Sequence, residues 1–217
     1  MQTIPAIHLF ADFSVLFKVF FMEPIILASS SPRRQEILKL LNIPYQVMIP
    51  NCNEEYPADL ALEEVPEFIA TRKIDSVARS LPSGTEYPWI LGADTLIIAN
   101  KKIYGKPESQ EDANKFLHEL QGKTHKVVTG LALFNSELHY VTNRTAITEV
   151  TFSKMTDEEI DWYISTDEWH GAAGGYRIQG KGSCFIKHIK GTNSAVMGLP
   201  IFELYDMLKE QNYPFMG

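Results

Sequence analysis

The stretch ILASSSPRRQEILKLL, residues Ile26 to Leu41, predicts a buried strand that turns directly into a helix. Ser31 is suited to the N-cap of that helix, and Pro32 fits its first helical position. The apolar side chains expected to share one face of the helix are Ile37, Leu40 and Leu41. A strand followed at once by an amphipathic helix is the repeating unit of α/β folds.

The same stretch places two arginines where a helix normally avoids them. Arg33 and Arg34 lie in the first turn, whose partial positive charge favours acidic side chains. Free N–H groups at a helix start bind anions, and guanidinium groups match phosphate oxygens in pairs. Ser29, Ser30 and Ser31 add hydroxyl donors to the same turn. The pattern favours a phosphate-bearing ligand, and two solvated surface arginines are the alternative.

The rest of the chain alternates strand and helix patterns. Strands are expected at residues 24–29, 45–49, 89–98, 125–135, 138–152 and 184–189. Helices are expected from Pro66 to Leu81 and at residues 109–120, 156–165 and 200–211. The long runs 125–135 and 138–152 are separated by two residues and therefore predict a hairpin. Together the patterns predict an α/β fold with one elongated sheet of parallel and antiparallel strands.

Composition narrows the class of protein. The chain has 217 residues, of which 45% are hydrophobic and 22% charged, as in ordinary globular proteins. The net charge of −7 argues against a nucleic-acid surface, which needs a basic patch. Cys52 and Cys184 lie far apart and match no metal-ligand spacing, so two reduced thiols in a cytoplasmic protein are expected.

The first 22 residues stand apart from this pattern. They are apolar but interrupted by titratable side chains, and they are short for a membrane span. They also lack the basic start and the cleavage site of a signal peptide. We expect Met22 to be the true start, with residues 1–22 a leader and residues 23–217 the functional domain. The alternative is a tail that associates with a membrane, and we expect no membrane partner for the domain itself.

Carboxylates and a lysine lie close to the predicted strand ends. Glu54 and Glu55 follow the strand at 45–49, and Lys106 lies in a Gly-Lys-Pro turn. Asp94 lies inside an apolar strand, where a carboxylate is costly unless it is paired or binds a metal. Taken singly, these are ordinary surface, capping and turn residues. Together they predict a magnesium-assisted polyphosphate hydrolase or transferase, because Mg²⁺ takes a few carboxylates plus substrate phosphates.

A glycine-rich segment, HGAAGGYRIQGKGS at residues 170–183, resembles a P-loop only in part. Gly182 stands where a P-loop needs Ser or Thr for magnesium, and a strand rather than a helix is expected afterwards. The P-loop is therefore excluded. Glycines still let the backbone approach a ligand closely, and the amide of Gln179 is suited to the edge of a base.

The motifs of this chain, and their order along it, resemble those of the Maf family of nucleoside triphosphate pyrophosphatases. The matching elements are ILASSSPRR, Glu54 after the second strand, ATRK with Lys73, GADT, GKP, GKTHKVVTG, GGYRIQG and VMGLP, from Pro24 to Leu208. The resemblance implies a fold like that of inosine triphosphate pyrophosphatases, with two lobes around a central cleft. It also implies a homodimer that uses Mg²⁺ or Mn²⁺ to hydrolyse a nucleoside triphosphate to monophosphate and pyrophosphate.

The resemblance also assigns roles to residues. The catalytic positions are Asp94, Lys73 and Glu54, with Asp94 as general base and Glu54 as metal ligand; Asp94 could equally be a metal ligand. The substrate-binding positions are Ser29, Ser31, Arg33, Arg34, Thr95, Lys106 and Gln179. Lys73 and the cations of this set are expected to neutralise phosphate oxygens.

The residues at two positions resemble those of the branch of the family that hydrolyses dTTP and UTP. Thr95 and Gln179 match that branch, and the 7-methyl-GTP branch differs at both places. One departure is Ala172, which stands where the dTTP/UTP branch usually has a lysine, and Arg177 is a candidate replacement cation. The alternatives are hydrolysis of 7-methyl-GTP or another modified nucleotide, and a non-catalytic nucleotide-binding regulator of cell division.

Overall fold

The computed structural model describes residues 22–82 and 87–215, so residues 1–21 of the expected leader lie outside it. Within these residues one seven-stranded sheet has the order β2-β1-β3-β5-β6-β7, with β4 paired to β3. The strands are β1 (Ile25–Ala28), β2 (Tyr45–Val47), β3 (Trp89–Ala99), β4 (Lys102–Tyr104), β5 (Thr124–Asn135), β6 (Tyr140–Phe152) and β7 (Ile186–Lys190). Strand β1 runs parallel to β2 and β3, and the other pairs are antiparallel, which confirms the predicted mixed sheet.

The helices surround this sheet. They are α2 (Pro32–Leu40), α3 (Val65–Ser80), α4 (Gln110–Leu120), α5 (Asp157–Ile164), α6 (Asn193–Met197) and α7 (Ile201–Glu210), with 3₁₀ turns η1 (Ala173–Gly175) and η2 (Lys181–Phe185). The predicted long helices and the β5–β6 hairpin are confirmed. The short elements β4, α6, η1 and η2 were not predicted, and η2 takes the first two residues of the strand expected at 184–189.

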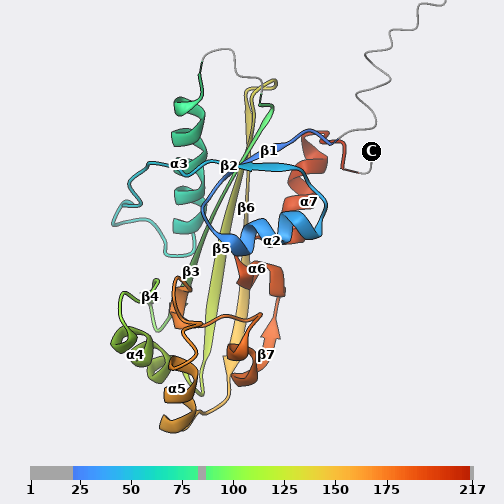
Figure 1. The fold of residues 1–217 in the computed structure, drawn as a ribbon. Helices are drawn as coiled ribbons and strands as arrows, with labels where there is room; N and C mark the ends of the chain where they lie inside the picture. Colours follow the sequence, from blue (N-terminus) through green and yellow to red (C-terminus); the bar gives the residue numbers. More distant parts are fainter. Residues whose placement is uncertain (1–21, 83–86, 216–217) are drawn as a thin grey trace, which may run out of the picture.

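The molecule is elongated along β5 and β6, which run through both of its halves (Figure 1). We call the half with β1, β2, α2, α3 and α7 the upper lobe, and the half with β4, α4, α5, η1, η2 and β7 the lower lobe. One buried apolar cluster lies in the lower lobe and two lie in the upper lobe. The lower cluster surrounds Tyr104 and Tyr163. The upper lobe has one cluster at Leu38 and Leu208, where α2 and α7 cover the sheet, and another at Ile74 of α3.

Helix α2 turns a different face inward from the one predicted. Its buried residues are Arg34, Ile37 and Leu38, whereas Leu40 is 72% exposed, so the prediction for Leu40 was wrong. The reason is that the guanidinium of Arg34 is buried, and positions three and four residues further on share its face. Ser31 occupies the N-cap as expected, but its side chain makes no capping hydrogen bond.

Two glycines let helix α3 lie directly against the sheet. A Cβ added at Gly92 would overlap the carbonyl oxygen of Ala70 in α3, and one at Gly130 would overlap the backbone at the start of that helix. Gly130 is the cross-strand partner of Asp94. The helix backbone therefore lies directly against the sheet beside Asp94, and Lys73 of this helix reaches that carboxylate.

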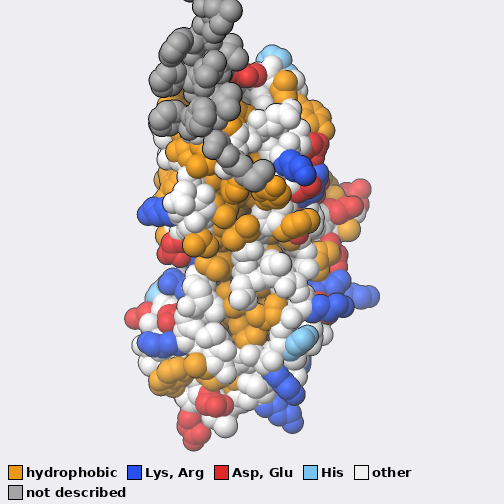
Figure 2. Space-filling view, turned by 90° about the vertical axis from the view of Figure 1, so that its right-hand side faces the viewer, with side chains coloured by type: hydrophobic (Ala, Val, Ile, Leu, Met, Phe, Trp, Pro, Cys, Tyr) orange, Lys and Arg blue, Asp and Glu red, His pale blue; other side chains and the backbone are white. Residues whose placement is uncertain are grey.

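Apolar side chains also reach the surface. On the face shown in Figure 2, on the side of α7, they form a broad band among the charged residues. Leu40 of α2 and Phe202 of α7 are 72% and 70% exposed. No helix in the described part of the chain is both long and apolar enough to cross a membrane. The homodimer expected from the resemblance stays a prediction.

Candidate functional site

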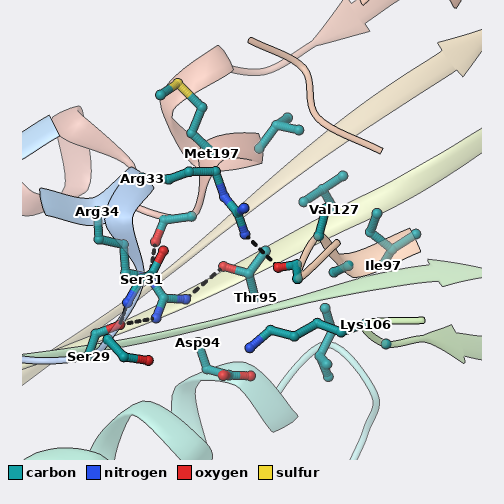
Figure 3. A pocket seen from close by; sticks show the side chains of 18 of the residues that line it. Ser29, Ser31, Arg33, Arg34, Asp94, Thr95, Ile97, Lys106, Val127 and Met197 are labelled. Carbon is teal, nitrogen blue, oxygen red and sulfur yellow. Dashed lines mark hydrogen bonds between the residues drawn. The ribbon is translucent and has the colours of Figure 1, made fainter. Parts of the chain in front are cut away.

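A pocket of about 580 Å³ lies between the two lobes and receives side chains from both. Every residue predicted to form the site lines it: Ser29, Ser31, Arg33, Arg34, Glu54, Lys73, Asp94, Thr95, Lys106 and Gln179. Figure 3 shows Asp94 and Lys106 on one side of this pocket, with the arginines of α2 on the other. Segments that are far apart in the sequence therefore form one site with both charge signs.

Lys73 joins the two carboxylates of the pocket. Its Nζ lies 2.7 Å from Oδ1 of Asp94 and 2.8 Å from Oε1 of Glu54. The side chains of Lys73 and Asp94 are 9% and 12% exposed, whereas that of Glu54 is 60% exposed. The ammonium therefore neutralises both carboxylates in this structure, and its expected contact with phosphate oxygens stays a prediction.

The charges around Glu54 keep it ionised. Burial raises the pKa of Glu54, but the hydrogen bond and charge of Lys73 outweigh burial and bring that pKa below its ordinary value. The charges of Lys106 and Arg34 act in the same direction. Glu54 is therefore an anion at neutral pH, available as a ligand for a cation.

Arg34 ties the serine turn to the middle of the pocket. Its Nη1 donates to Oγ of Ser29 at 2.8 Å, its Nε to the carbonyl of Gly198 at 2.8 Å and its Nη2 to Oγ1 of Thr95 at 3.2 Å. Three of the five N–H donors of the guanidinium are thus engaged within the protein. Burial lowers the pKa of Arg34, and the charge of Asp94 opposes that shift. Arg34 is fixed in place before any ligand arrives.

The serine turn keeps donors for a ligand. Ser29 Oγ accepts hydrogen bonds from the N–H of Ser31 and from Arg34, so its own hydroxyl proton remains to be donated. Helix α2 has no side-chain cap, so the N–H groups of its first turn are also left for a ligand. This arrangement is suited to an anion at the helix start, as the sequence predicted.

Thr95 connects Arg34 to the strand β5 through hydrogen bonds. Thr129 Oγ1 donates to the carbonyl of Ala195 at 2.8 Å, so the 2.9 Å hydrogen bond between Thr129 and Thr95 takes its proton from Thr95. Thr95 also accepts a hydrogen bond from Arg34. Its hydroxyl therefore holds Arg34. Gln179, the other residue that matches the dTTP/UTP branch, is exposed on the pocket wall.

The carboxylates suit a metal that is shared with a substrate. The residues that the structure describes contain no group of three or more His, Cys, Asp or Glu side chains that could hold a metal alone. Glu54 and Asp94 instead form a pair about one ammonium group. Mg²⁺ is commonly held by one or two carboxylates together with substrate phosphates and water, so this pair fits Mg²⁺ or Mn²⁺ bound with a nucleotide.

Sequence reasoning missed the supports and the apolar wall of the site. Ile97, Val127 and Met197 line the pocket beside the charged groups, and Thr129 supports Thr95. The alternation along the predicted strand at 125–135 places Val127 and Thr129 on one face, which could have indicated both. The contribution of α6 depends on a five-residue helix that the sequence did not predict.

These observations define a class of protein: a mixed α/β protein of two lobes whose pocket combines a lysine-bridged carboxylate pair with an arginine-bearing helix start. The chain belongs to the Maf family, since residues 24–211 match the family described as Maf-like protein. A relative named dTTP/UTP pyrophosphatase from Bacillus cytotoxicus is 41% identical over 189 residues, covering 87% of this chain and 96% of the relative. One of the same name from Pyrococcus furiosus is 40% identical over 192 residues, covering 87% and 95%.

A solved structure also resembles this chain. The Ham1 protein of Staphylococcus aureus matches 60% of this chain and 72% of its own, with 15% identity and a TM-score of 0.42. The family assignment rests on the sequence relatives.

Proposed function

We propose that the protein hydrolyses nucleoside triphosphates, dTTP and UTP foremost, to the monophosphate and pyrophosphate by attack of water at the α-phosphorus. The observation that carries this proposal is the position of Lys73 between Asp94 and Glu54, in the same pocket as Arg33 and Arg34. Membership in the Maf family and the names of the relatives support the choice of substrate.

The carboxylates would prepare the attacking water. Lys73 holds Oδ1 of Asp94, and the other carboxylate oxygen takes a proton from water as general base. Glu54, with or without Asp94, would hold a divalent cation, Mg²⁺ or Mn²⁺, which lowers the pKa of bound water and offsets phosphate charge. The bridge by Lys73 keeps the two carboxylates together although they would otherwise repel one another.

The opposite side of the pocket would hold the triphosphate. Transfer at phosphorus depends mainly on positioning and neutralisation of charge. Ser29, the start of α2, Arg33 and Arg34 supply donors on one side, and Lys106 supplies a cation on the other. Gln179 would hydrogen-bond the pyrimidine, and a base of the wrong pattern would leave polar groups unpaired.

A nucleotide panel tests the proposal. Purified protein is given dTTP, UTP, CTP, GTP and 7-methyl-GTP with Mg²⁺, with Mn²⁺ and with EDTA, and the phosphate products are separated by ion exchange. We expect monophosphate and pyrophosphate, fastest from dTTP and UTP, and none with EDTA. Faster hydrolysis of 7-methyl-GTP than of dTTP and UTP would contradict the proposed substrate class. If folded protein hydrolyses none of the nucleotides, the protein is a nucleotide-binding regulator instead.

The matched variants are Asp94→Asn and Asp75→Asn. Asp94→Asn should lower kcat by at least about 100-fold with folding retained, which is the scale of one general base. Asp75 is exposed on α3 outside this pocket, so the same substitution there should leave the rate unchanged. Near-normal turnover by Asp94→Asn would eliminate Asp94 as base or essential ligand.

We also propose that the reaction takes place in the cytoplasm. Cys52 and Cys184 are both free thiols in the structure, which supports a reducing compartment. Cell fractionation with an antibody against the protein tests this location.

A further inference from the structure

Two guanidinium groups from opposite lobes lie close together at the pocket. Arg33, in the first turn of α2, donates from Nη2 to the carbonyl of Gly171 at 3.2 Å. Arg177, in the loop after η1, donates from Nη2 to the carbonyl of His170 at 2.8 Å. Consecutive carbonyls of one lower-lobe loop therefore hold a cation from each lobe.

This arrangement is unfavourable for the protein alone. Burial lowers the pKa of Arg33, and the charge of Arg177 lowers it further, against an opposing effect of Glu36. Among residues 22–82 and 87–215, neither arginine forms an ion pair with a carboxylate. Nε of Arg177 is buried there without a hydrogen-bond partner. Adjacent like charges and an unpaired buried donor both cost free energy, and a bound anion would remove both costs.

Arg177 is also fixed in position. Its neighbours Tyr176 and Ile178 are buried on either side, and its own N–H donates to the hydroxyl of Tyr163 at 3.0 Å. The backbone is thus anchored while the side chain lines the pocket. The hydrogen bond from Nη2 to the carbonyl of His170 holds the guanidinium itself, so the side chain loses less conformational freedom when it binds a ligand, which favours a binding role over a solvated surface role.

The charges also have an order along the pocket. Arg34 donates to Oγ1 of Thr95, the chain neighbour of Asp94. Arg33 and Arg177 donate instead to carbonyls of the lower-lobe loop. These two guanidinium groups therefore lie at the end of the pocket away from the carboxylate that would activate water. An anion at that end would be the part of a polyphosphate furthest from the attacked phosphorus.

We propose that Arg33 and Arg177 form a clamp between the lobes for the phosphate oxygens of the leaving pyrophosphate, an inference that rests on the proposed function. Guanidinium forks bind phosphate oxygens in pairs and carry a permanent charge, which stabilises pyrophosphate as it leaves. Because the clamp takes one arginine from each lobe, a triphosphate chain also links the lobes. The clamp adds Arg177 to the residues proposed to bind the substrate.

Arg177→Ala tests the clamp, with Lys181→Ala as the matched control. Lys181, the first residue of η2, is an exposed cation four residues further along the chain and does not line the pocket; its removal changes the net charge by the same amount. We expect Arg177→Ala to lower kcat/KM by about tenfold or more, which is the scale of a lost charged hydrogen bond. The loss should be the same for dTTP, UTP, CTP and GTP, because the clamp contacts phosphate and not the base. Inhibition by pyrophosphate should weaken in parallel, and Arg177→Lys should recover only part because it lacks the fork.

Three results would overturn the clamp: an effect no larger than that of Lys181→Ala, a loss that differs strongly among the bases, or unchanged inhibition by pyrophosphate. Calorimetric binding of inorganic tripolyphosphate separates this inference from the proposed function. If no nucleotide is hydrolysed but tripolyphosphate binds and needs Arg177, the clamp stands and the proposed activity fails. If nucleotides are hydrolysed and tripolyphosphate binding ignores Arg177, the activity stands and the clamp fails.

Discussion

Substituting Lys73 by methionine removes the charge that joins the two carboxylates and keeps the length of the side chain. Asp94, whose side chain is 12% exposed, would then face Glu54 without a partner. Breaking a buried ion pair from one side costs about 3–5 kcal/mol. The link to the 60% exposed Glu54 counts as a surface pair and adds less than about 1 kcal/mol. Because the pocket admits water to Asp94, we expect a loss near the lower limit, about 3 kcal/mol at pH 7.

Urea unfolding of four proteins measures this loss: wild type, Lys73→Met, Asp94→Asn and the double variant. The double variant should be more stable than Lys73→Met, since it no longer contains the unpaired charge of Asp94. The coupling free energy between the two substitutions should be about 2–3 kcal/mol. Lys102→Met is the control, because Lys102 pairs with Glu119 at 3.0 Å but is 49% exposed, which predicts a loss below about 1 kcal/mol. The reasoning is refuted if Lys73→Met costs no more than Lys102→Met, or if the coupling is within about 0.5 kcal/mol of zero.

Three further predictions concern other parts of the molecule. Gly130→Ala should destabilise the protein by about 1–3 kcal/mol in urea unfolding and lower the hydrolysis rate, because a Cβ there pushes α3 and Lys73 off the sheet; an unchanged midpoint would contradict this. Burial lowers the pKa of His125 to about 4, so as pH falls below 6.5 the unfolded chain takes up a proton before the folded chain does. Unfolding free energy should therefore fall by roughly 3 kcal/mol between pH 7 and 4, and His125→Gln should flatten that slope; an equal slope in the variant would rule out His125 as its source. Gln179→Ala should shrink the preference for dTTP and UTP over GTP in kcat/KM, whereas a uniform loss for all bases would mean that Gln179 only supports its loop.

The sequence predicted the long elements well, for local reasons. The hairpin of β5 and β6 was predicted because two long β-rich runs are separated by only two residues. The helices expected at residues 109–120 and 156–165 begin at side-chain caps formed by Ser109 and Thr156, and such a cap needs only residues three positions apart. The short elements β4 and α6 were not predicted, since three to five residues carry no periodic pattern. The contacts of α6 with β5 also come from distant sequence.

The inward face of α2 shows where local patterns fail. Hydrophobicity placed Leu40 in the core, yet the buried face is set by Arg34. A buried guanidinium is stable only where carbonyl and hydroxyl oxygens surround it, and these come from Gly198, Ser29 and Thr95. No pattern within the helix contains that information.

The sequence by itself determined which residues needed an unusual partner. A carboxylate at Asp94 inside an apolar strand has to be neutralised, and arginines at a helix start favour an anion, and both conclusions follow from local physics. Only the tertiary structure decided that the partner of Asp94 is Lys73, and that Arg33 and Arg177 bind neighbouring carbonyls of one loop. The first contact depends on the β3–β5 register and on the close approach of α3 at Gly130. The second depends on two lobes meeting at one loop, because such contacts join segments whose distance in space is unrelated to their spacing in the chain.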